Sequence, residues 1–565
     1  MPKEIAKNKK DYSELSKDDL IKIVEKLESR KKYGLIWDEE KVKEQFEKDA
    51  VNALPVLKEV KGKEITDKNG GPVNILIEGD NYHALSVLNF THQGKIDVIY
   101  IDPPYNTGGG DFKYNDRFIN KEDSFRHSKW LSFMDKRLRL AKGILKDDGV
   151  MFISIDDNEQ PQLSLLLSEI FGEDNVETMI WRKSGFGRDG KMKNTTTFRK
   201  DHEYIMICYK YNKKLNKIEE IPDFQNEYGN PDNDPRGPYK AGSISRREDA
   251  SNPNHKNYYS IKSPSKKVFT RQFDLPKEDF EELNNDILIN KDGKKVSRIY
   301  WGTNGDSVPA IKIFLNEERS ITPYSILLNK GTTTEGTKEV GEILGKDCTE
   351  LRPKPTRLIQ TLIQLGSKVD NPIIVDFFAG TGTTGHAVLQ YIQKANNKSQ
   401  FILCTNDENK ICTDYCYPRI IKVMKSGYKD SNGKNIKPLG GNLKYFKTKF
   451  VKDASNKDDF KIRITKECTE MLCLREGIFD EIKKTDDYRI FQQGDQTLAV
   501  YYSLDRKALS ELKKELNKIN GDKIFYCFTL DPLGVDKSDF IGWNNVSLEP
   551  IPQKILDVYK QIYEY

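Results

Sequence analysis

The chain has 565 residues, of which 32% are charged, with a formal net charge of +5 and a mean hydropathy of -0.70. This length is too great for one hydrophobic core and predicts about three or four domains. No apolar run reaches the roughly 18 residues of a membrane span, and the charged N-terminus MPKEIAKNKKD lacks the apolar stretch of a secretory signal, which favours the cytoplasm. The 8 cysteines are scattered, so we expect reduced thiols and no metal site.

Residues 1–60 are expected to be helical and peripheral. Ser16 and Asp19 have the spacing of an N-terminal capping signature, and an apolar stripe at helical spacing follows from Leu20. Such a module could bind a partner or pack on the rest of the chain, and the sequence favours neither.

From Asn74 the pattern becomes that of a doubly wound α/β fold. The segment NILIEGDN predicts a strand that ends near Asp80, and KIDVIYIDPPYNTG predicts a buried strand that stops at Asp102. A helix around Trp130–Leu145 and the strand VMFISID follow. Strands that alternate with helices and end in polar residues are typical of such sheets, which bind ligands at the carboxyl ends of their strands.

The corner Asp102-Pro103-Pro104-Tyr105 is the first candidate site. Two consecutive prolines continue neither a helix nor a central strand, so the chain must leave the sheet as a rigid, extended corner. Asp102 could accept one N–H of a planar amine and the Pro103 carbonyl the other, while Tyr105 stacks on the ring that carries the amine. The alternative is a proline-ended strand whose Asp caps the next turn; Tyr105 and the preceding strand favour chemistry.

Residues 181–332 interrupt this alternation and are expected to form an irregular insert. The insert begins with WRKSGFGRDGKMKNTTTFRK, in which glycines permit a close approach of the backbone to a ligand and cations favour phosphate contacts. Because the net charge is small, a nucleic-acid footprint must be local, and a solvated charged face is the simpler alternative. The candidate contacts are Arg182, Lys183, Arg188, Lys191 and Lys193.

The strand and helix pattern resumes with NPIIVDFFAGTGTTGHAV. It predicts a strand that ends at Asp376, a turn with Gly380 and Gly382, and a helix whose free amides would favour an anionic group. The next strand, FILCT, is followed by Asp407 and Glu408, and an acid about 20 residues after such glycines can hold the ribose of a nucleoside cofactor. This context leaves a dinucleotide and S-adenosylmethionine equally open.

The segments DPPYNTG, DFFAGTGTTGHAV, LIEGDN, SIDDNE, HEYIMICYK and GTTTEGTKEVGEIL together resemble an amino-methyltransferase that acts on DNA. The catalytic tetrapeptide precedes Asp376 by 274 residues (376 − 102), which is the circularly permuted β-class order with a target-recognition region between the two motifs. Within that class, TEGTKE, RPKPTRLI and KYGLIWDEE resemble the modification (Mod) subunit of type III restriction–modification systems. The resemblance covers about residues 30–425.

The resemblance implies transfer of a methyl group from S-adenosylmethionine to N6 of an adenine flipped out of double-stranded DNA. Asp102, Pro103, Pro104 and Tyr105 would hold the base, and Asp in the first position favours adenine N6 over cytosine N4. The residues expected to bind the cofactor are Asp80, Lys354, Asp376, Phe378, Gly380, Gly382 and Glu408.

Three details of the resemblance concern single residues. Lys354 matches a lysine near the cofactor carboxylate, and Asp407 rivals Glu408 as the ribose acid. Leu351 and Arg352 depart from the family pattern, which puts the edge of the cofactor pocket in doubt. We assign neither His202 nor His386 to catalysis.

The expected fold is therefore a doubly wound, Rossmann-like methyltransferase sheet with an inserted target-recognition domain and small terminal domains. Its predicted regions are 1–60 (helical module), 61–180 (catalytic half of the core), 181–332 (target-recognition insert), 333–440 (cofactor-binding half) and 441–565 (C-terminal α/β module). The resemblance implies a homodimer and a separate helicase–nuclease restriction subunit. A non-catalytic DNA-specificity subunit, a cytosine-N4 methylase and an RNA methylase are the alternatives.

Overall fold

The structure is a computed structural model that describes residues 53–67, 71–114, 117–184, 198, 200–220, 228–317, 319–452, 457–531, 534–535, 540–543 and 545–563, with positions 16–17, 20–21 and 37. It divides into two compact units, Met1–Asn216 with Tyr324–Tyr565, and Lys217–Pro323. Most of the predicted N-terminal helical module lies outside the described residues. The same holds for Arg188, Lys191 and Lys193.

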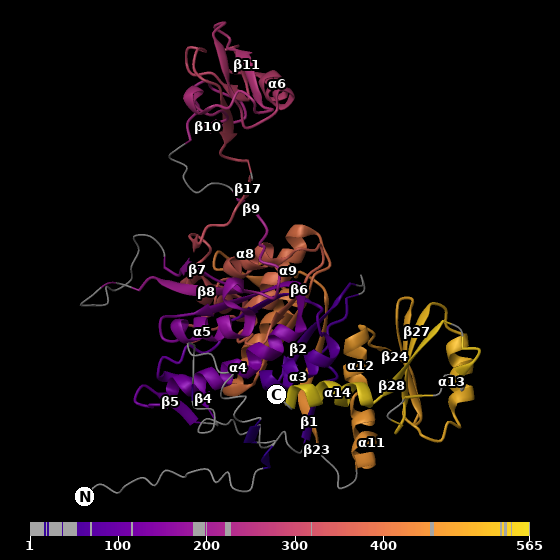
Figure 1. The fold of residues 1–565 in the computed structure, drawn as a ribbon. Helices are drawn as coiled ribbons and strands as arrows, with labels where there is room; N and C mark the ends of the chain where they lie inside the picture. Colours follow the sequence, from indigo (N-terminus) through magenta and orange to yellow (C-terminus); the bar gives the residue numbers. More distant parts are fainter. Residues whose placement is uncertain are drawn as a thin grey trace, which may run out of the picture. The chain divides into compact units, whose positions relative to one another are not determined.

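The first unit is built on a ten-stranded sheet with the order β1-β23-β2-β20-β19-β3-β6-β8-β7-β18 (Figure 1). The strands from β23 to β6 in this order are parallel, β8 runs antiparallel to β6 and β7, and β1 runs antiparallel to β23. This arrangement confirms the predicted α/β class. The bounds are β1 Ala53–Glu59, β2 Val73–Glu78, β3 Ile96–Ile101, β6 Leu145–Ile155, β7 Val176–Arg182, β8 His202–Tyr209, β18 Ile326–Leu327, β19 Ile373–Asp376, β20 Gln400–Thr405 and β23 Asn442–Lys452.

Strands that are far apart in the sequence lie side by side in this sheet. β3 pairs with β19, where Val98 lies opposite Ile374, and β2 pairs with β20, where Glu78 lies opposite Thr405. The carboxyl ends of β2, β3, β19 and β20 therefore share one edge of the sheet. This is the edge at which parallel sheets bind ligands.

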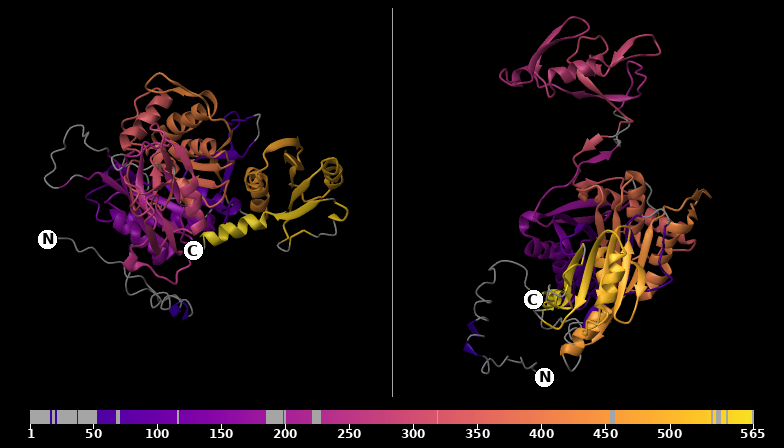
Figure 2. Two further views of the ribbon diagram at one scale, coloured as in Figure 1. Left: turned by 90° about the horizontal axis from the view of Figure 1, so that it is seen from above. Right: turned by 90° about the vertical axis from the view of Figure 1, so that its right-hand side faces the viewer.

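Helices cover both faces of the sheet (Figures 1 and 2). One face carries α3 (Asn81–Thr91), α4 (Arg126–Ile144) and α5 (Gln160–Phe171), and the other carries α8 (Thr356–Gly366) and α9 (Thr383–Ala395). The contact with α8 is close, because a Cβ on Gly366 would lie 2.6 Å from Cγ1 of Val150. Both faces are dry, as the wholly buried side chains of Ile99 and Val98 on successive positions of β3 show.

Two strands differ from the predicted domain boundaries. β1 lies within the segment predicted as a helical module, and β23 lies within the segment assigned to the C-terminal module, yet both belong to the central sheet. Pro55 weakens the strand signal of β1, but an edge strand tolerates proline. Leu57 and Phe446 are almost fully buried, so the sheet gains apolar contacts from both additions.

The rest of the C-terminal region contains a separate five-stranded sheet, β24-β25-β26-β27-β28. Its strands β26 and β27 are parallel neighbours joined by helix α13. The last helix, α14, packs on α3, and Tyr559 donates a hydrogen bond to the Pro55 carbonyl of β1. The bounds are α11 Lys457–Glu467, α12 Thr469–Glu476, β24 Asp480–Lys484, β25 Tyr488–Gln493, β26 Gln496–Tyr501, α13 Leu509–Asn517, β27 Asp522–Phe528, β28 Val546–Ile551 and α14 Gln553–Tyr563.

The second unit, Lys217–Pro323, is narrower than the predicted insert 181–332. It holds a three-stranded sheet of β10 (Tyr239–Ser243), β16 (Ala310–Phe314) and β15 (Ile299–Tyr300), and a helix, α6 (Lys277–Asn285). Its own small core contains Phe273, Phe280 and Trp301. The chain enters along β9 (Ile218–Glu220) and leaves along β17 (Arg319–Ile321), which pair with each other, Ile218 opposite Ile321.

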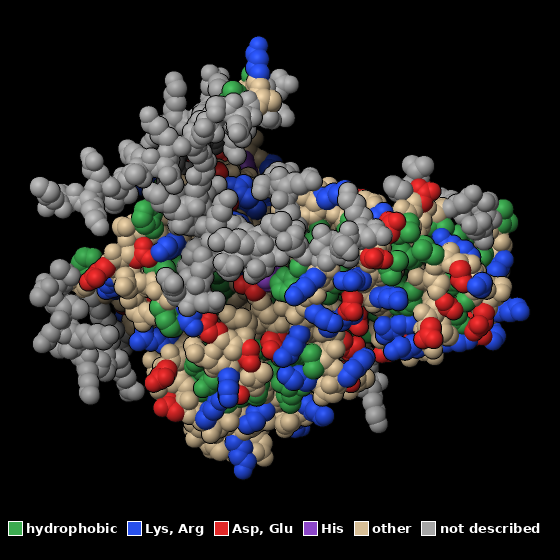
Figure 3. Space-filling model, turned by 90° about the horizontal axis from the view of Figure 1, so that it is seen from below, with side chains coloured by type: hydrophobic (Ala, Val, Ile, Leu, Met, Phe, Trp, Pro, Cys, Tyr) green, Lys and Arg blue, Asp and Glu red, His purple; other side chains and the backbone are tan. Residues whose placement is uncertain are grey.

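On the face shown in Figure 3, basic and acidic side chains are interspersed. No helix in the described ranges is long and apolar enough to cross a membrane. All 8 cysteines are free, buried thiols. Within the described part of the chain, no group of His, Cys, Asp and Glu side chains has the arrangement of a metal site.

Candidate active site

The predicted corner Asp102–Tyr105 follows β3 directly, at the ligand-binding edge of the sheet. Trp130 of α4 donates its indole N–H to the Pro104 carbonyl at 2.7 Å. No donor from the described ranges is bonded to the Pro103 carbonyl. The corner is thus fixed through the second proline, while the carbonyl of the first stays available to a ligand.

A second anchor follows the corner at Asn106. This residue is fully buried and has a left-handed backbone, with φ 55°. Its side-chain amide donates to Glu159 Oε1 at 2.5 Å and to the Arg126 carbonyl at 3.2 Å. Asn tolerates this conformation better than most residues, so the chain can turn sharply just after Tyr105.

The side chains of the corner belong to a compact charged cluster. The Lys354 ammonium lies 2.7 and 2.8 Å from the two carboxylate oxygens of Asp102 and 2.7 Å from the Tyr105 hydroxyl. It also lies 3.3 Å from Glu203 Oε2. The Tyr105 hydroxyl is 2.7 Å from Asp102 Oδ1 and 3.2 Å from Glu203 Oε2, and Lys183 pairs with Glu203 Oε1 at 3.2 Å.

The charges of this cluster stabilise each other. Burial alone would raise the pKa of Glu203, but Lys354 and Lys183 hold it below its ordinary value. Burial alone would lower the pKa of Lys354, but Asp102 and Glu203 raise it. Burial and both carboxylates raise the pKa of Tyr105 well above 10. At neutral pH the cluster therefore holds a carboxylate at Glu203, an ammonium at Lys354 and a neutral phenol at Tyr105.

The contact between Lys354 and a cofactor carboxylate, which the resemblance implied, stays a prediction. In the structure the Lys354 ammonium is bonded to Asp102 and Tyr105 of the corner. The physical reason is the burial of Glu203 beside Asp102. Two neighbouring carboxylates at the edge of a core require a counter-charge.

The glycine turn after β19 forms the other half of the edge. Asp376 is buried, and its carboxylate accepts hydrogen bonds from the Phe378 amide at 2.9 Å and from the Thr384 hydroxyl. Burial raises the pKa of Asp376 to about 7. Its side chain therefore holds the turn in shape, and its contact with the cofactor stays a prediction.

The two glycines permit the tight backbone of this turn, and the space beside one of them, Gly380, is open. Gly380 and Gly382 have left-handed φ values of 49° and 78°. A Cβ on Gly380 would meet only the Phe378 carbonyl, at 3.8 Å, so space remains beside its backbone. Open space at a helix N-terminus fits the approach of a nucleoside cofactor, which is the group that the sequence predicts here.

The two candidate ribose acids after β20 are used differently. Asp407 Oδ1 accepts hydrogen bonds from the Thr413 amide at 2.9 Å and the Thr413 hydroxyl at 3.1 Å. Glu408 is partly exposed and pairs with Lys113 of the hairpin strand β4 (Gly109–Tyr114). Asp407 is thus occupied within the fold, whereas Glu408 could exchange its lysine for a ligand.

Asp80 lies at the same edge, after β2. Its carboxylate caps α3 by accepting from the Tyr82 amide at 2.8 Å, and Arg137 lies 3.4 Å away. The next residue, Asn81, donates to the Phe377 carbonyl at 3.0 Å. The end of β2 is therefore tied to the glycine turn, as a shared cofactor site requires.

Sequence reasoning assigned no role to Glu203 and Glu159. Glu203 follows His202 in HEYIMICYK, and the signal available was an acid at the start of a buried strand. Glu159 ends SIDDNE. Its carboxylate is fully buried, with Oε1 2.7 Å from His127 Nδ1, and burial raises the pKa of Glu159 to about 7. His386 is buried beside Arg419, so it packs and does not face solvent.

Comparison with known families matches residues 96–412 to the N6/N4 DNA methylase family. The chain belongs to this DNA methylase family. The StyLTI Mod subunit of a type III restriction-modification enzyme from Salmonella typhimurium is 31% identical over 367 residues, covering 60% of this chain and 53% of that subunit. The EcoPI Mod subunit of Escherichia phage P1 is 31% identical over 472 residues, covering 72% and 69%. The chain thus spans about half of the first relative and about two thirds of the second, and it belongs with these Mod subunits.

Among solved structures, the cytosine-N4-specific PvuII DNA methyltransferase aligns with a TM-score of 0.30 at 10% identity, covering 62% of this chain and 90% of that one. The fold class of this DNA methylase rests on its own strand order.

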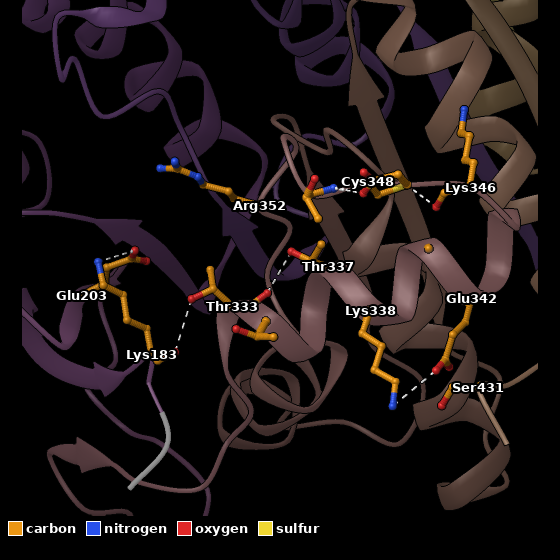
Figure 4. Close-up of a pocket in the computed structure, with 14 residues that line it drawn as sticks. Lys183, Glu203, Thr333, Thr337, Lys338, Glu342, Lys346, Cys348, Arg352 and Ser431 are labelled. Carbon is orange, nitrogen blue, oxygen red and sulfur yellow. Dashed lines mark hydrogen bonds and ion pairs between the residues drawn. The ribbon is translucent and has the colours of Figure 1, made fainter. Parts of the chain in front are cut away.

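An open cavity of about 840 Å³ lies beside the charged cluster (Figure 4). Lys183 and Glu203 form one wall, and residues of α7 (Thr333–Leu344), including Thr333 and Lys338, form another. The cavity thus brings solvent to Glu203.

Two of the five predicted basic contacts of this DNA methylase lie in the described part of the chain. Arg182 is 3.5 Å from Asp201, and Lys183 is paired with Glu203. Both charges are partly used within the fold. Their contact with DNA stays a prediction.

Proposed function

We propose that this chain transfers a methyl group from S-adenosylmethionine to N6 of an adenine extruded from duplex DNA. The observation that carries the proposal is the shared edge of the sheet, where the corner Asp102–Tyr105 lies beside the open glycine turn. Family membership supports a DNA methylase, and the Mod relatives support a modification and recognition subunit of a type III restriction–modification system.

The corner supplies the contacts for the amine. Asp102 accepts one N–H and the Pro103 carbonyl accepts the other, so the nitrogen lone pair is directed away from the ring plane. Tyr105 stacks on the extruded base. Lys354 orients the Asp102 carboxylate, so it acts as a positioning residue. Pre-organised positioning of this kind is the main source of rate enhancement here.

The cofactor would lie along the glycine turn. Gly380 and Gly382 would admit its methionine end beside Phe378, and Glu408 would accept the ribose hydroxyls after releasing Lys113. When bound, S-adenosylmethionine supplies an electrophilic methyl group on a sulfonium. Asp80 and Asp376 support the site by holding α3 and the turn.

Adenine N6 is the proposed target because Asp stands first in the tetrapeptide, and cytosine N4 is the second candidate because the family includes both reactions. Both amines are planar and have two N–H donors, so the same corner geometry serves either.

The proposed partners are double-stranded DNA, a second copy of the chain and a separate restriction subunit with helicase and nuclease activity. Arg182 and Lys183, with Arg188, Lys191 and Lys193, would contact phosphates. Phosphate contacts impose a steep decrease of affinity with salt, so a titration of duplex DNA at several salt concentrations tests this part.

The decisive experiment detects modified bases. DNA from cells with and without the chain is digested, and N6-methyladenine and N4-methylcytosine are quantified by mass spectrometry. We expect N6-methyladenine only where the chain is present, at one sequence context when the DNA is sequenced for modified bases. Detection of N4-methylcytosine alone would identify cytosine N4 as the target atom in place of adenine N6. The absence of both modified bases would refute the proposed activity.

A further inference from the structure

The reaction proposed above must dispose of one proton in each turnover. As the amine nitrogen forms its bond to the methyl carbon, the carbon–sulfur bond of the cofactor breaks and leaves its electron pair on sulfur. The nitrogen gains a bond and must lose one N–H proton. Asp102 is the carboxylate that accepts this N–H, so the proton arrives there first.

The exposed side of Asp102 is the side that the base takes. Its side chain is 28% exposed, and both carboxylate oxygens are bonded to Lys354. A stacked base covers the open side, so the proton must leave through the groups behind Asp102. Burial alone would lower the pKa of Lys354, but Asp102 and Glu203 outweigh this effect and raise it. Lys354 is therefore an ammonium that already carries its full set of protons, and it cannot accept another.

The Tyr105 hydroxyl offers the other connection. Within the described ranges, only Lys354 and Tyr105 are bonded to both carboxylates, Asp102 and Glu203. The hydroxyl lies 2.7 Å from Asp102 Oδ1 and 3.2 Å from Glu203 Oε2, both within reach of proton transfer. Glu203 in turn lines the open cavity beside Lys183 (Figure 4).

We propose that Tyr105 and Glu203 form the route by which the proton of the methylated amine passes from Asp102 to the water of this cavity. The hydroxyl takes the proton from Asp102 and gives its own to Glu203 Oε2 in the same step, so the phenol stays neutral. Glu203 then releases the proton to water. No other reactant is needed, and the three groups return to their starting states.

The charges around Glu203 suit this passage. Lys354 and Lys183 favour its ionised form, so a proton on Glu203 is released at once at neutral pH. Asp102 and Asp156 are the negative groups that act on this region, and Tyr105 is neutral. Glu203 touches no substrate atom in this scheme, so it is a positioning and relay residue and not a catalytic one.

The inference rests on the proposed methyl transfer, and one experiment separates the two. Single-turnover transfer of a labelled methyl group to sheared duplex DNA from a host without this chain is measured for the full-length wild type, Glu203→Gln and Tyr105→Phe. The rate constants are measured in mixtures of H2O and D2O. Glu177→Gln is the matched control, because Glu177 also accepts a tyrosine hydroxyl, that of Tyr209, and pairs with a lysine, outside the site.

We expect Glu203→Gln and Tyr105→Phe each to lower the rate constant about 10- to 100-fold, with affinities for cofactor and DNA unchanged within about twofold. The double variant should be no slower than either single variant. A plot of the wild-type rate constant against the D2O fraction should be curved, which indicates that more than one proton moves in the step. The same plot for Glu203→Gln should be a straight line. Should Glu203→Gln fail to fold, Tyr105→Phe, which keeps the stacking ring, carries the same readouts.

Two results would overturn the route while leaving the proposed function intact. One is a Glu203→Gln rate within twofold of the wild type. The other is a slower rate with the same curved dependence on D2O, which would mean that Glu203 only holds Lys354 in place. A wild-type chain that transfers no methyl group to any DNA overturns the proposed function, and the route falls with it.

Discussion

At the carboxyl end of β3 the site is made of side chains, whereas at the carboxyl end of β19 it is made of backbone. Asp102, Tyr105, Glu203 and Lys354 form a closed network of short contacts before any substrate is present. The glycine turn instead presents open space beside Gly380. The proposed amine end is therefore fixed in advance by charge, and the proposed cofactor end is shaped by the absence of side chains.

The difference suits the two proposed ligands. An amine must be held within tenths of an ångström for an in-line attack, and charged hydrogen bonds in a sheltered site give that precision. A nucleoside cofactor is recognised over a longer surface, so a close approach of backbone matters more than any single contact. If the two ends are built separately, a substitution at one end should leave the function of the other unchanged.

The largest effect is expected for Asp102→Ala. Loss of the amine acceptor should lower methyl transfer by about 100- to 10,000-fold, while cofactor affinity stays within a few-fold. The labelled-methyl assay measures the first quantity and isothermal titration the second. Asp97→Ala, on the opposite end of β3, removes another paired carboxylate and should retain transfer. A normal rate in Asp102→Ala would show that the corner does not bind the amine.

The next effect is expected for Lys354→Met, which removes the cation from two neighbouring carboxylates. We expect a loss of about 3–5 kcal/mol in the free energy of unfolding at pH 8, and slower methyl transfer with unchanged cofactor affinity. In the wild type the lowered pKa of Glu203 contributes stability above its unfolded value, and this contribution is lost only as pH falls through the lowered pKa. Without Lys354, burial raises that pKa, so stability is lost as pH rises.

The stability difference between wild type and Lys354→Met should therefore grow from pH 5 to pH 8. Urea unfolding at the two pH values measures it. A difference that is the same at both would contradict the counter-charge role of Lys354. Lys338→Met, whose ammonium pairs only with Glu342 on the surface of α7, is the control and should show a loss below about 1 kcal/mol.

A smaller effect is expected at the backbone end, for Gly380→Ala. The methyl group would enter the space left for the cofactor, so cofactor affinity should fall about tenfold or more, and methyl transfer at saturating cofactor should change much less. Gly345→Ala is the matched control, because Gly345 has φ 72° at the end of α7 with nothing within 4 Å of its Cβ. It shares the backbone strain and should bind cofactor normally. Equal affinities in the two variants would contradict a cofactor at Gly380.

The smallest effect is expected for Glu159→Gln. Burial raises the pKa of Glu159 to about 7 in the folded chain. The contribution of this group to the free energy of unfolding is therefore present at low pH and is lost as pH rises through that value. The neutral amide avoids this loss. We expect Glu159→Gln to be more stable than the wild type by about 1–2 kcal/mol at pH 8.5 and equal to it near pH 4.5.

Unfolding midpoints at the two pH values provide the measurement for Glu159→Gln. Glu173→Gln, at an exposed position close in sequence, serves as the control and should show no pH-dependent gain. A Glu159→Gln protein that is less stable than the wild type at pH 8.5 would show that Asn106 needs the charged form.

The backbone end of the site was the easier to predict from sequence. A strand, two glycines, a helix and a further strand with acids follow one another between residues 373 and 408, so the local pattern contains the whole arrangement. The α/β class followed from the same periodicity. Asp407 and Glu408 could not be separated, because the π-helical turn that occupies Asp407 has no sequence signature.

The side-chain end could be predicted only in part. The corner could be recognised from four consecutive residues, but its partners lie far away along the sequence. Lys354 is separated from Asp102 by 252 residues and Glu203 from Tyr105 by 98. Contacts of this range follow from the strand order and not from local propensity. For the same reason β1 and β23 were assigned to terminal modules, since an edge strand is defined by the partner it finds.

The way the chain enters and leaves its second unit has a consequence for evolution. Ile218 and Ile321 lie opposite each other in the β9–β17 pair, so both connections start from one place. An insertion with adjoining ends can be lengthened, shortened or exchanged without altering the sheet that carries the chemistry. Under the proposed function, with this unit as the target-recognition domain, exchange of one segment would change which DNA sequence is methylated while the sheet stays unchanged.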